Sequence, residues 1–188
     1  MQRISDAPSI ARFPNGVTGA WLARRWYYMP KSRRAYSVRQ ISPGDRRLLA
    51  EFALGLARTA PEREQPVIRA IGDLLFEHVL SSADEAVGFA ALENTAAGDR
   101  IVGVVACRRD DGGAQFAVAV SDGYRDEQVG RTLLSTLVRH ARRAGIARLI
   151  GEMSWSNRPM QMLAMSMGFI VEPVARDRNL RRLVLALR

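Results

Sequence analysis

The strongest local pattern in the chain is a short alternating stretch followed directly by a helical one. Between residues 115 and 120, phenylalanine and valine alternate with alanine, which predicts a strand. Residues 121–123 then form a polar turn, and a helix is expected to begin near Gln128. Within that helix, apolar residues recur every four positions and predict one buried face: Val129, Leu133, Leu137 and Ala141.

Similar patterns fill most of the chain from residue 36 onward. Further strands are expected at residues 36–41, 85–92, 100–109, 147–153, 169–171 and 180–187. One helix is expected after Ser42, which is placed as its N-cap with Pro43 at the first helical position and Asp45 at the third. A second is expected over residues 65–80, and a short one ends at Gly168. The order β-α-α-β-β-β-α-β-α-β-β predicts an α/β (α+β) domain, a mixed sheet flanked by helices.

The predicted connection between the strand ending at Val120 and the next helix has the chemistry of an anion site. The first N–H groups of a helix lack intrahelical partners and lie at the positive end of its dipole, a combination that suits phosphate. Gly130 removes a side chain where the backbone would approach a ligand closely. The spacing alone is equally compatible with a plain strand–turn–helix connection that binds nothing.

Composition places the chain among soluble globular proteins. Its 188 residues suit one domain, with 47% hydrophobic and 25% charged residues. No apolar run approaches the roughly 18 residues of a membrane-spanning helix, and no apolar signal core is visible, so we expect no membrane span. The single cysteine, Cys107, excludes an internal disulfide and favours a reducing cytoplasm. Because Cys107 lies in the apolar run IVGVVAC, a buried thiol is favoured over a nucleophile.

The net charge of +9 comes almost entirely from arginine, since Lys31 is the only lysine. Arginine binds phosphates and carboxylates through its planar fork, so a nucleotide-like ligand or an acidic partner is compatible with it. Residues 1–35 read as a basic, aromatic N-terminal extension broken by proline and glycine, ahead of a main domain at 36–188. Docking of this extension on its own domain or on a second subunit of a homodimer is favoured over nucleic-acid binding, because no nucleic-acid recognition motif is present.

Two motifs resemble those of the GNAT acetyltransferases. The segment 125–130, RDEQVG, resembles the R/Q-x-x-G-x-G/A loop that binds the acyl-CoA pyrophosphate in this family. An acidic residue on a later strand, Glu152, is followed by Asn157 and by a helix that closes in Gly168-Phe169, as in the family's later pattern. The chain looks most like the GNAT domain of bacterial protein-lysine acetyltransferases. The resemblance covers residues 36–187 and is strongest over 114–169.

The resemblance implies a mostly antiparallel sheet of six to seven strands with about four helices, and direct attack of an amine on acetyl-CoA without a metal. The backbone of Val118, Ala119 and Val120 would hold the pantetheine, and the side chain of Asn157 would reach the thiol-proximal arm. The pyrophosphate would be bound at Arg125, Asp126, Glu127, Gln128, Val129, Gly130, Arg131 and Thr132. Glu152 would act as the general base if its pKa is raised by partial burial; a purely structural carboxylate is the equally weighted alternative.

Several positions depart from the family pattern. Gln128 replaces a glycine, Asp126 and Glu127 would repel phosphate, and Gln115 stands where related lysine acetyltransferases carry a glutamate. Ala164 replaces a common tyrosine. Two functions therefore stay open: an N-acetyltransferase that acts on a lysine, a protein N-terminus or a small amine, and a non-catalytic relative that binds acyl-CoA or a macromolecular partner. The enzyme is favoured.

Overall fold

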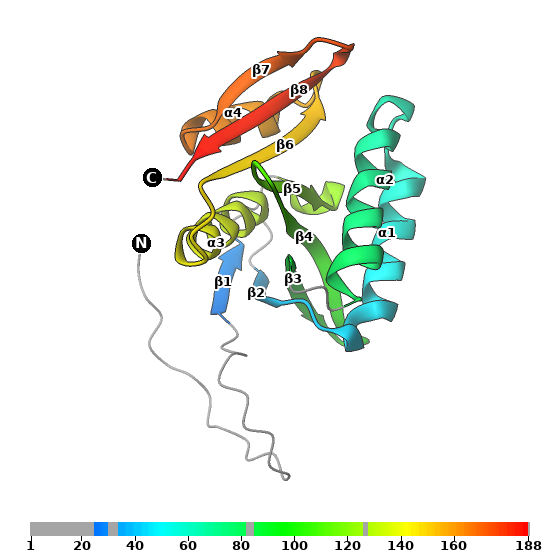
Figure 1. Cartoon of the computed structure of the whole chain (residues 1–188). Helices are drawn as coiled ribbons and strands as arrows, with labels where there is room; N and C mark the ends of the chain where they lie inside the picture. Colours follow the sequence, from blue (N-terminus) through cyan, green and yellow to red (C-terminus); the bar gives the residue numbers. More distant parts are fainter. Residues whose placement is uncertain (1–24, 30–33, 82–84, 126–127, 188) are drawn as a thin grey trace.

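In the computed structural model, the described residues 25–29, 34–81, 85–125 and 128–187 form an eight-stranded sheet with helices on both faces (Figure 1). The strands are β1 (Arg25–Met29), β2 (Arg34–Gln40), β3 (Ala86–Thr95), β4 (Gly98–Asp110), β5 (Gly113–Val120), β6 (Arg148–Ser154), β7 (Ile170–Val174) and β8 (Asp177–Ala186). Their spatial order is β1-β2-β3-β4-β5-β6-β8-β7. Neighbours are antiparallel except β5 and β6, which are parallel. The predicted fold class is confirmed.

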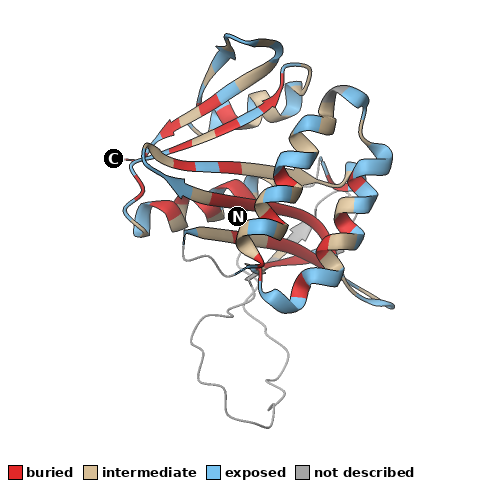
Figure 2. Cartoon of the chain, turned by 45° about the vertical axis from the view of Figure 1, so that its right-hand side comes forward, coloured by how far each residue is buried: buried red, intermediate tan, exposed pale blue. Residues whose placement is uncertain are grey.

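The helices bury their apolar faces against the two sides of this sheet. The four helices are α1 (Arg46–Thr59), α2 (Gln65–Asp73), α3 (Val129–Arg143) and α4 (Arg158–Ser166). Helices α1 and α2 lie side by side on one face, and α3 covers the other (Figure 1). The buried residues form two clusters, one containing Leu133 and Leu137 of α3 and Ala164 of α4, the other containing Leu49 of α1 and Ile71 of α2. Figure 2 shows these buried stretches along the central strands.

The second helix is longer than its α-helical part. After Asp73 the chain continues as a π-helical turn over Leu74–Val79, and the Leu80 N–H donates to the carbonyl of Leu75, five residues earlier. The helix expected over residues 65–80 is therefore present with a wider last turn. The expected capping box ahead of α1 is also present: Ser42 is the N-cap of the 3₁₀ turn Pro43–Asp45, and the Asp45 carboxylate accepts from the Ser42 N–H at 2.8 Å.

The N-terminal part of the sheet begins earlier than the sequence pattern predicts. The expected first strand starts at residue 36, whereas β2 starts at Arg34 and β1 pairs with it antiparallel. The ring of Tyr27 on β1 stacks on the ring of Tyr36 on β2, with centroids 5.3 Å apart. A five-residue segment of the predicted extension is thus an edge strand of the sheet, and the boundary at residue 36 falls inside the β1–β2 hairpin.

The sheet opens between its two central strands. Strands β5 and β6 pair only over Ala114–Phe116 and Leu149–Gly151, and beyond these residues they diverge. Gly151 permits the close approach at the vertex, because a Cβ built there would lie 2.7 Å from the Phe116 ring. In Figure 1, β6, β7 and β8 lean away from the rest of the sheet. This divergence leaves the second half of β5 without a neighbour on its β6 side.

Candidate active site

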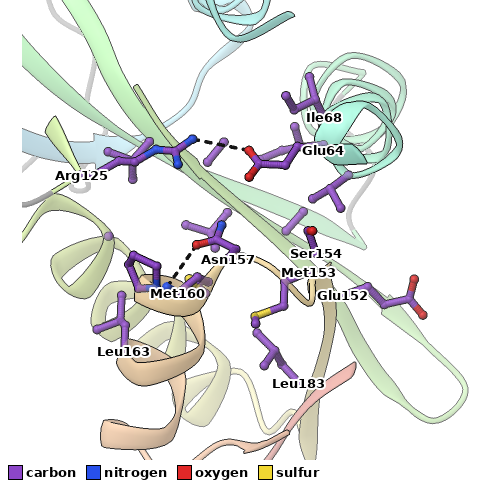
Figure 3. A pocket seen from close by; sticks show the side chains of 18 of the residues that line it. Glu64, Ile68, Arg125, Glu152, Met153, Ser154, Asn157, Met160, Leu163 and Leu183 are labelled. Carbon is purple, nitrogen blue, oxygen red and sulfur yellow. Dashed lines mark hydrogen bonds and ion pairs between the residues drawn. The ribbon is translucent and has the colours of Figure 1, made fainter. Parts of the chain in front are cut away.

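A cavity of about 330 Å³ occupies the opening between β5 and β6 (Figure 3). Its walls come from segments far apart in the sequence: α1 and α2 on one face of the sheet, the first turn of α3 and of α4 on the other, and the two diverging strands between them. Residues that line it include Leu56, Glu64, Ile68, Val118, Val120, Arg125, Gln128, Gly130, Arg131, Glu152, Asn157, Met160 and Leu163. The cavity therefore passes through the sheet and opens towards both helical layers.

The free edge of β5 offers backbone hydrogen-bonding groups to this cavity. The Ser121 N–H donates to Val102 on the β4 side at 3.0 Å. Backbone groups alternate in direction along a strand, so the N–H and C=O of Val118 and Val120 point to the opposite side, where β6 has diverged. Val118, Ala119 and Val120 all line the cavity. This arrangement gives an extended ligand the equivalent of a neighbouring strand.

The N-terminus of α3 forms the next part of the wall. Gln128 adopts the left-handed conformation, with φ of 61° and ψ of 7°, and occupies the N-cap. The N–H groups of Val129, Gly130 and Arg131 belong to the first helical turn, which has no intrahelical acceptors. A Cβ at Gly130 would lie 3.4 Å from Leu163 and 3.7 Å from Val120, so this glycine keeps the wall between α3 and α4 open.

Other residues of the expected pyrophosphate loop are placed differently. The Arg125 N–H donates to the Asp122 carbonyl at 3.3 Å, and the Thr132 N–H to the Gln128 carbonyl at 3.0 Å, so both amides are already bonded. The Thr132 hydroxyl hydrogen-bonds to the Tyr36 hydroxyl at 2.8 Å, and Thr132 does not line the cavity. The backbone N–H groups that remain available to a pyrophosphate among the described residues of this segment are therefore those of the first turn of α3. Asp126 and Glu127 lie outside the described residues.

Asn157 lies at the start of α4, and its place there follows from capping. Its side-chain Oδ1 accepts a hydrogen bond from the Met160 N–H at 3.2 Å, which satisfies one of the free amides of the helix (Figure 3). Pro159 follows within the first turn, where its missing N–H costs nothing. Because Oδ1 is used by the cap, the amide Nδ2 is the group that Asn157 offers to a ligand in the cavity.

Glu152 lines the cavity, but its carboxylate is not sequestered. Its side chain is 46% exposed, and Oε1 lies 3.8 Å from Nη2 of Arg182 on β8. Figure 3 shows the carboxylate turned away from the middle of the cavity. The carboxylate is thus open to solvent, and Arg182 is its one ion-pair partner among the described residues.

A second carboxylate, which the sequence patterns did not single out, lies on the opposite wall. Glu64 ends the 3₁₀ turn Glu62–Glu64 ahead of α2, and its side chain is only 14% exposed. Its Oε2 lies 3.5 Å from Nη2 of Arg125, and the same Arg125 atom lies 2.8 Å from Oδ1 of Asp122. The Arg125 side chain thus spans from the α3 wall to the α2 wall (Figure 3). In the sequence, Glu64 resembles an ordinary acidic residue of a helix first turn, and only the fold brings it to the site.

The loop that carries Arg125 is fixed by a buried carboxylate from β3. The Tyr124 hydroxyl donates to Oε2 of Glu93 at 2.6 Å, and Nη2 of Arg100 donates to the same oxygen at 2.7 Å. Glu93 is only 4% exposed. Burial and the bond to Glu93 raise the pKa of Tyr124 above its ordinary value, so the phenol stays protonated as a donor.

The remaining candidate residues lie away from the cavity. Gln115 is exposed on β5, and Ala164 is fully buried on the inner face of α4. Neither residue lines the cavity. Cys107 is buried in β4 as expected, and burial raises its pKa to about 11, which keeps the thiol protonated. His140 on α3 packs edge-on against Phe89, and burial lowers its pKa. Neither residue contributes a reactive group to the cavity.

Among the described residues, no group of three or more histidine, cysteine, aspartate or glutamate side chains could hold a metal ion. None of the described helices is both long enough and apolar enough to cross a membrane.

Comparison with known proteins agrees with this geometry. The model of the acetyltransferase (GNAT) family matches residues 51–169. The chain is similar to the GNAT domain of PAT from S. lividans, with a TM-score of 0.64 and 21% identity over 87% of this chain and 97% of that chain. It is also similar to the PaiA N-acetyltransferase of Thermoplasma acidophilum in complex with coenzyme A, with a TM-score of 0.60 and 19% identity over 80% of this chain and 98% of that one. A third similar structure is the ribosomal-protein-S18-alanine N-acetyltransferase of Escherichia coli. Its TM-score is 0.58, with 17% identity over 81% of this chain and 94% of that chain. A comparison with curated proteins gives no match.

The family model covers more than half of the chain, and the chain therefore belongs to the acetyltransferase (GNAT) family. It is an enzyme of the N-acetyltransferase class, and its general reaction is the transfer of an acetyl group from acyl-CoA. The resemblance in the sequence motifs is confirmed at this level.

Proposed function

We propose that the protein transfers the acetyl group of acetyl-CoA to an amine by direct attack in a ternary complex. The observation that carries the proposal is the cavity between β5 and β6, which joins the free β5 edge, the first turn of α3 and the first turn of α4. One extended ligand with a phosphate end can contact all three. The T. acidophilum structure has a similar fold and is a complex with coenzyme A, which supports acetyl-CoA as the ligand in this proposal.

In this proposal, the chain holds acetyl-CoA at three places. The first-turn N–H groups of Val129, Gly130 and Arg131 bind the pyrophosphate, because they combine free donors with the positive end of the helix dipole. The pantetheine lies along Val118–Val120, whose open backbone groups pair with its amides. Nδ2 of Asn157 donates to the arm near the thioester.

The chemical step needs the neutral amine and a stabilised oxyanion. The amine nitrogen attacks the thioester carbonyl carbon, and a backbone N–H of β5, at Val118 or Val120, stabilises the negative oxygen that develops. The C–S bond then breaks, the thiolate leaves with CoA, and the new amide retains the acetyl group. Glu152 accepts the proton of the attacking nitrogen, directly or through water that reaches its half-exposed carboxylate. The thiolate takes up a proton from solvent.

Two measurements on the full chain test the proposal. Acetyl-CoA should raise the melting temperature in a concentration-dependent way, because a ligand that binds only the folded state stabilises it. Release of the CoA thiol should then require both acetyl-CoA and an amine, and should fall when the amine is omitted. Binding without amine-dependent thiol release would instead support the non-catalytic acyl-CoA binder.

A further inference from the structure

The α2 wall of the cavity holds a carboxylate for which the proposed mechanism has no role. Glu64 and Glu152 are the two carboxylates among the described residues that line the cavity. The Glu64 side chain is 14% exposed and that of Glu152 is 46% exposed, so Glu64 is the more enclosed of the two. Among the described residues its one ion-pair partner is Arg125, which comes from the opposite wall, with Nη2 at 3.5 Å.

Glu64 is held firmly where it lies. Its N–H donates to the Pro61 carbonyl at 2.8 Å, which closes the 3₁₀ turn. The next residue, Gln65, ties that turn to the end of α1, since its Nε2 donates to the carbonyls of Ala57 at 3.1 Å and Ala60 at 3.3 Å. The turn also contacts β6, the strand of Glu152. The backbone of Glu64 is therefore fixed at the cavity wall.

The partner of Glu64 is also one of the cations that line the cavity next to the first turn of α3. Arg125 lies between Asp122, at 2.8 Å, and Glu64, at 3.5 Å, so one positive charge faces two negative ones. A pyrophosphate bound at the first turn of α3 brings further negative charge to this place. Phosphate accepts the same paired hydrogen bonds from a guanidinium fork as a carboxylate does. A pyrophosphate bound here can therefore replace Glu64, the longer of the two contacts, as a partner of Arg125. Glu64 would then lose this cation.

The surroundings of Glu64 define what can replace that cation. The neighbouring cavity wall is made of Leu56, Val67, Ile68 and Ile71, which carry no hydrogen-bonding side chain. An ammonium group can bind the carboxylate while an apolar stem lies on this wall. An α-amine would place its adjoining peptide group against the same wall, where the side chains offer no partner.

We propose that Glu64 is a specificity-determining residue that binds the ammonium group of the acceptor, an amine carried on an apolar stem, after acyl-CoA has taken over Arg125. This inference rests on the proposed transferase function and names its acceptor class. The bound ammonium loses its proton before attack, as in the step assigned to Glu152. A free alkylamine and a lysine side chain share this chemistry, so the test includes both.

The test uses the full chain, the variant Glu64→Gln and the matched control Glu62→Gln. Glu62 lies in the same 3₁₀ turn but is exposed and does not line the cavity. The acceptors are butylamine, a peptide with a blocked N-terminus and one lysine, and a lysine-free peptide with a free α-amine. Thiol release gives the acceptor KM and kcat, and calorimetry gives the acetyl-CoA Kd.

We expect kcat/KM of the parent to be at least about tenfold higher for butylamine or the lysine peptide than for the α-amine peptide. Glu64→Gln should raise the acceptor KM about tenfold to hundredfold, the usual value of a hydrogen bond to a charged group, with a smaller change in kcat. It should also tighten acetyl-CoA binding, more so at low salt, because Arg125 loses a competing carboxylate. Glu62→Gln should change neither quantity.

The opposite results separate this inference from the proposed function. Suppose that the parent is active but that Glu64→Gln keeps the parent's acceptor KM, or that the parent prefers the α-amine peptide. Either result overturns the role of Glu64 and leaves the proposed transferase reaction intact. A parent that binds acetyl-CoA but releases no thiol with any of the three acceptors overturns both. Arg125→Gln provides a second variant: it should weaken acetyl-CoA binding without raising the acceptor KM, and a raised KM there would contradict the exchange of partners.

Discussion

The Tyr124 hydroxyl donates a 2.6 Å hydrogen bond to the carboxylate of Glu93, across 31 positions of the chain. The bond joins the 3₁₀ turn Asp122–Tyr124, which precedes α3, to strand β3 of the sheet. Because Glu93 is buried and also paired with Arg100, the bond anchors the turn Asp122–Tyr124 to the sheet. We therefore expect acyl-CoA binding to depend on this tyrosine, which does not itself line the cavity.

Tyr124→Phe tests this dependence. The variant keeps the ring and removes the hydroxyl, and a hydrogen bond to a charged group contributes about 1.5–3 kcal/mol. We expect the free energy of unfolding to fall by this order and the acetyl-CoA Kd to rise, while kcat at saturating acetyl-CoA stays close to that of the parent. Urea unfolding and calorimetry give the two quantities. An unchanged Kd in a destabilised variant would show that the bond serves stability alone.

Gln128→Gly should stabilise the protein, which is unusual for a glycine substitution. Gln128 has φ of 61°, a conformation that costs a residue with a Cβ about 1–2 kcal/mol and glycine very little. Part of this gain is offset by the greater freedom of glycine in the unfolded chain, about 0.5–1 kcal/mol. The net expectation is a slightly higher midpoint in urea, together with tighter acetyl-CoA binding because the side chain leaves the cavity wall.

The matched control for this substitution is Gln161→Gly. Gln161 lies inside α4, where the conformation is helical and glycine costs about 1 kcal/mol relative to a good helix former. The two variants should therefore shift the urea midpoint in opposite directions. A loss of stability in both would mean that the left-handed backbone at Gln128 carries no strain.

A methyl group at position 130 should not disturb the fold, but a larger side chain there should interfere with ligand binding. A Cβ there would lie 3.4 Å from Leu163, an ordinary contact distance, so Gly130→Ala should fold normally. Gly130→Glu places both bulk and negative charge beside the first-turn amides, and we expect acetyl-CoA affinity to fall at least tenfold by calorimetry. Gly72→Glu on α2, where a Cβ meets no atom within 4 Å, is the control and should bind as the parent does.

The chain's local patterns predict most of its elements, because the alternating and helical periods are strong wherever one face is buried. The helix start at Val129 falls one residue from its predicted place, and the capping box at Ser42 is present. The strand at Arg25–Met29 was not predicted. Its short, aromatic-rich sequence has no clear alternation, and its place depends on pairing with the next strand.

The candidate site was predictable only where the motif is continuous in sequence. The loop before α3 and the cap at Asn157 are local features, and the structure brings them to one cavity. Glu64 could not be found in this way, because 61 positions separate it from Arg125 and no local pattern relates the two. The exposure of Glu152 was also beyond the sequence, since its surroundings are set by β8 and by the divergence of β5 and β6.

A pH prediction concerns the pair that anchors the start of α1. Burial opposes ionisation of Asp45, but hydrogen bonds of 2.6 Å from each of two Arg39 nitrogens and a further one from Ser42 outweigh it, so the pKa of Asp45 is lowered. A lowered pKa in the folded state gives a contribution to stability that is complete above the unfolded-state pKa of about 3.9 and is lost as pH falls through the folded-state value. The parent should therefore lose stability below about pH 4 more steeply than Asp45→Asn does. Equal slopes in acid titrations followed by circular dichroism would contradict this assignment.

The last prediction concerns the general base, and it rests on Glu152. The residue lines the cavity, but its carboxylate is half exposed and lies 3.8 Å from Arg182. A positioned base contributes roughly 10²–10⁴-fold to the rate, so Glu152→Gln, which keeps the shape and removes the basicity, should lower kcat within this range and leave the acetyl-CoA Kd unchanged. Glu172 on β7 faces Arg182 in the sheet register and does not line the cavity, so Glu172→Gln is the matched control and should retain full activity. A fully active Glu152→Gln enzyme would show that water or the free amine of the acceptor removes the proton unaided.

The loss of kcat in Glu152→Gln should also shrink as pH rises towards the pKa of the acceptor amine, because more of that amine is then already neutral. A loss that stays constant over this range would indicate that Glu152 orients the acceptor rather than accepting its proton.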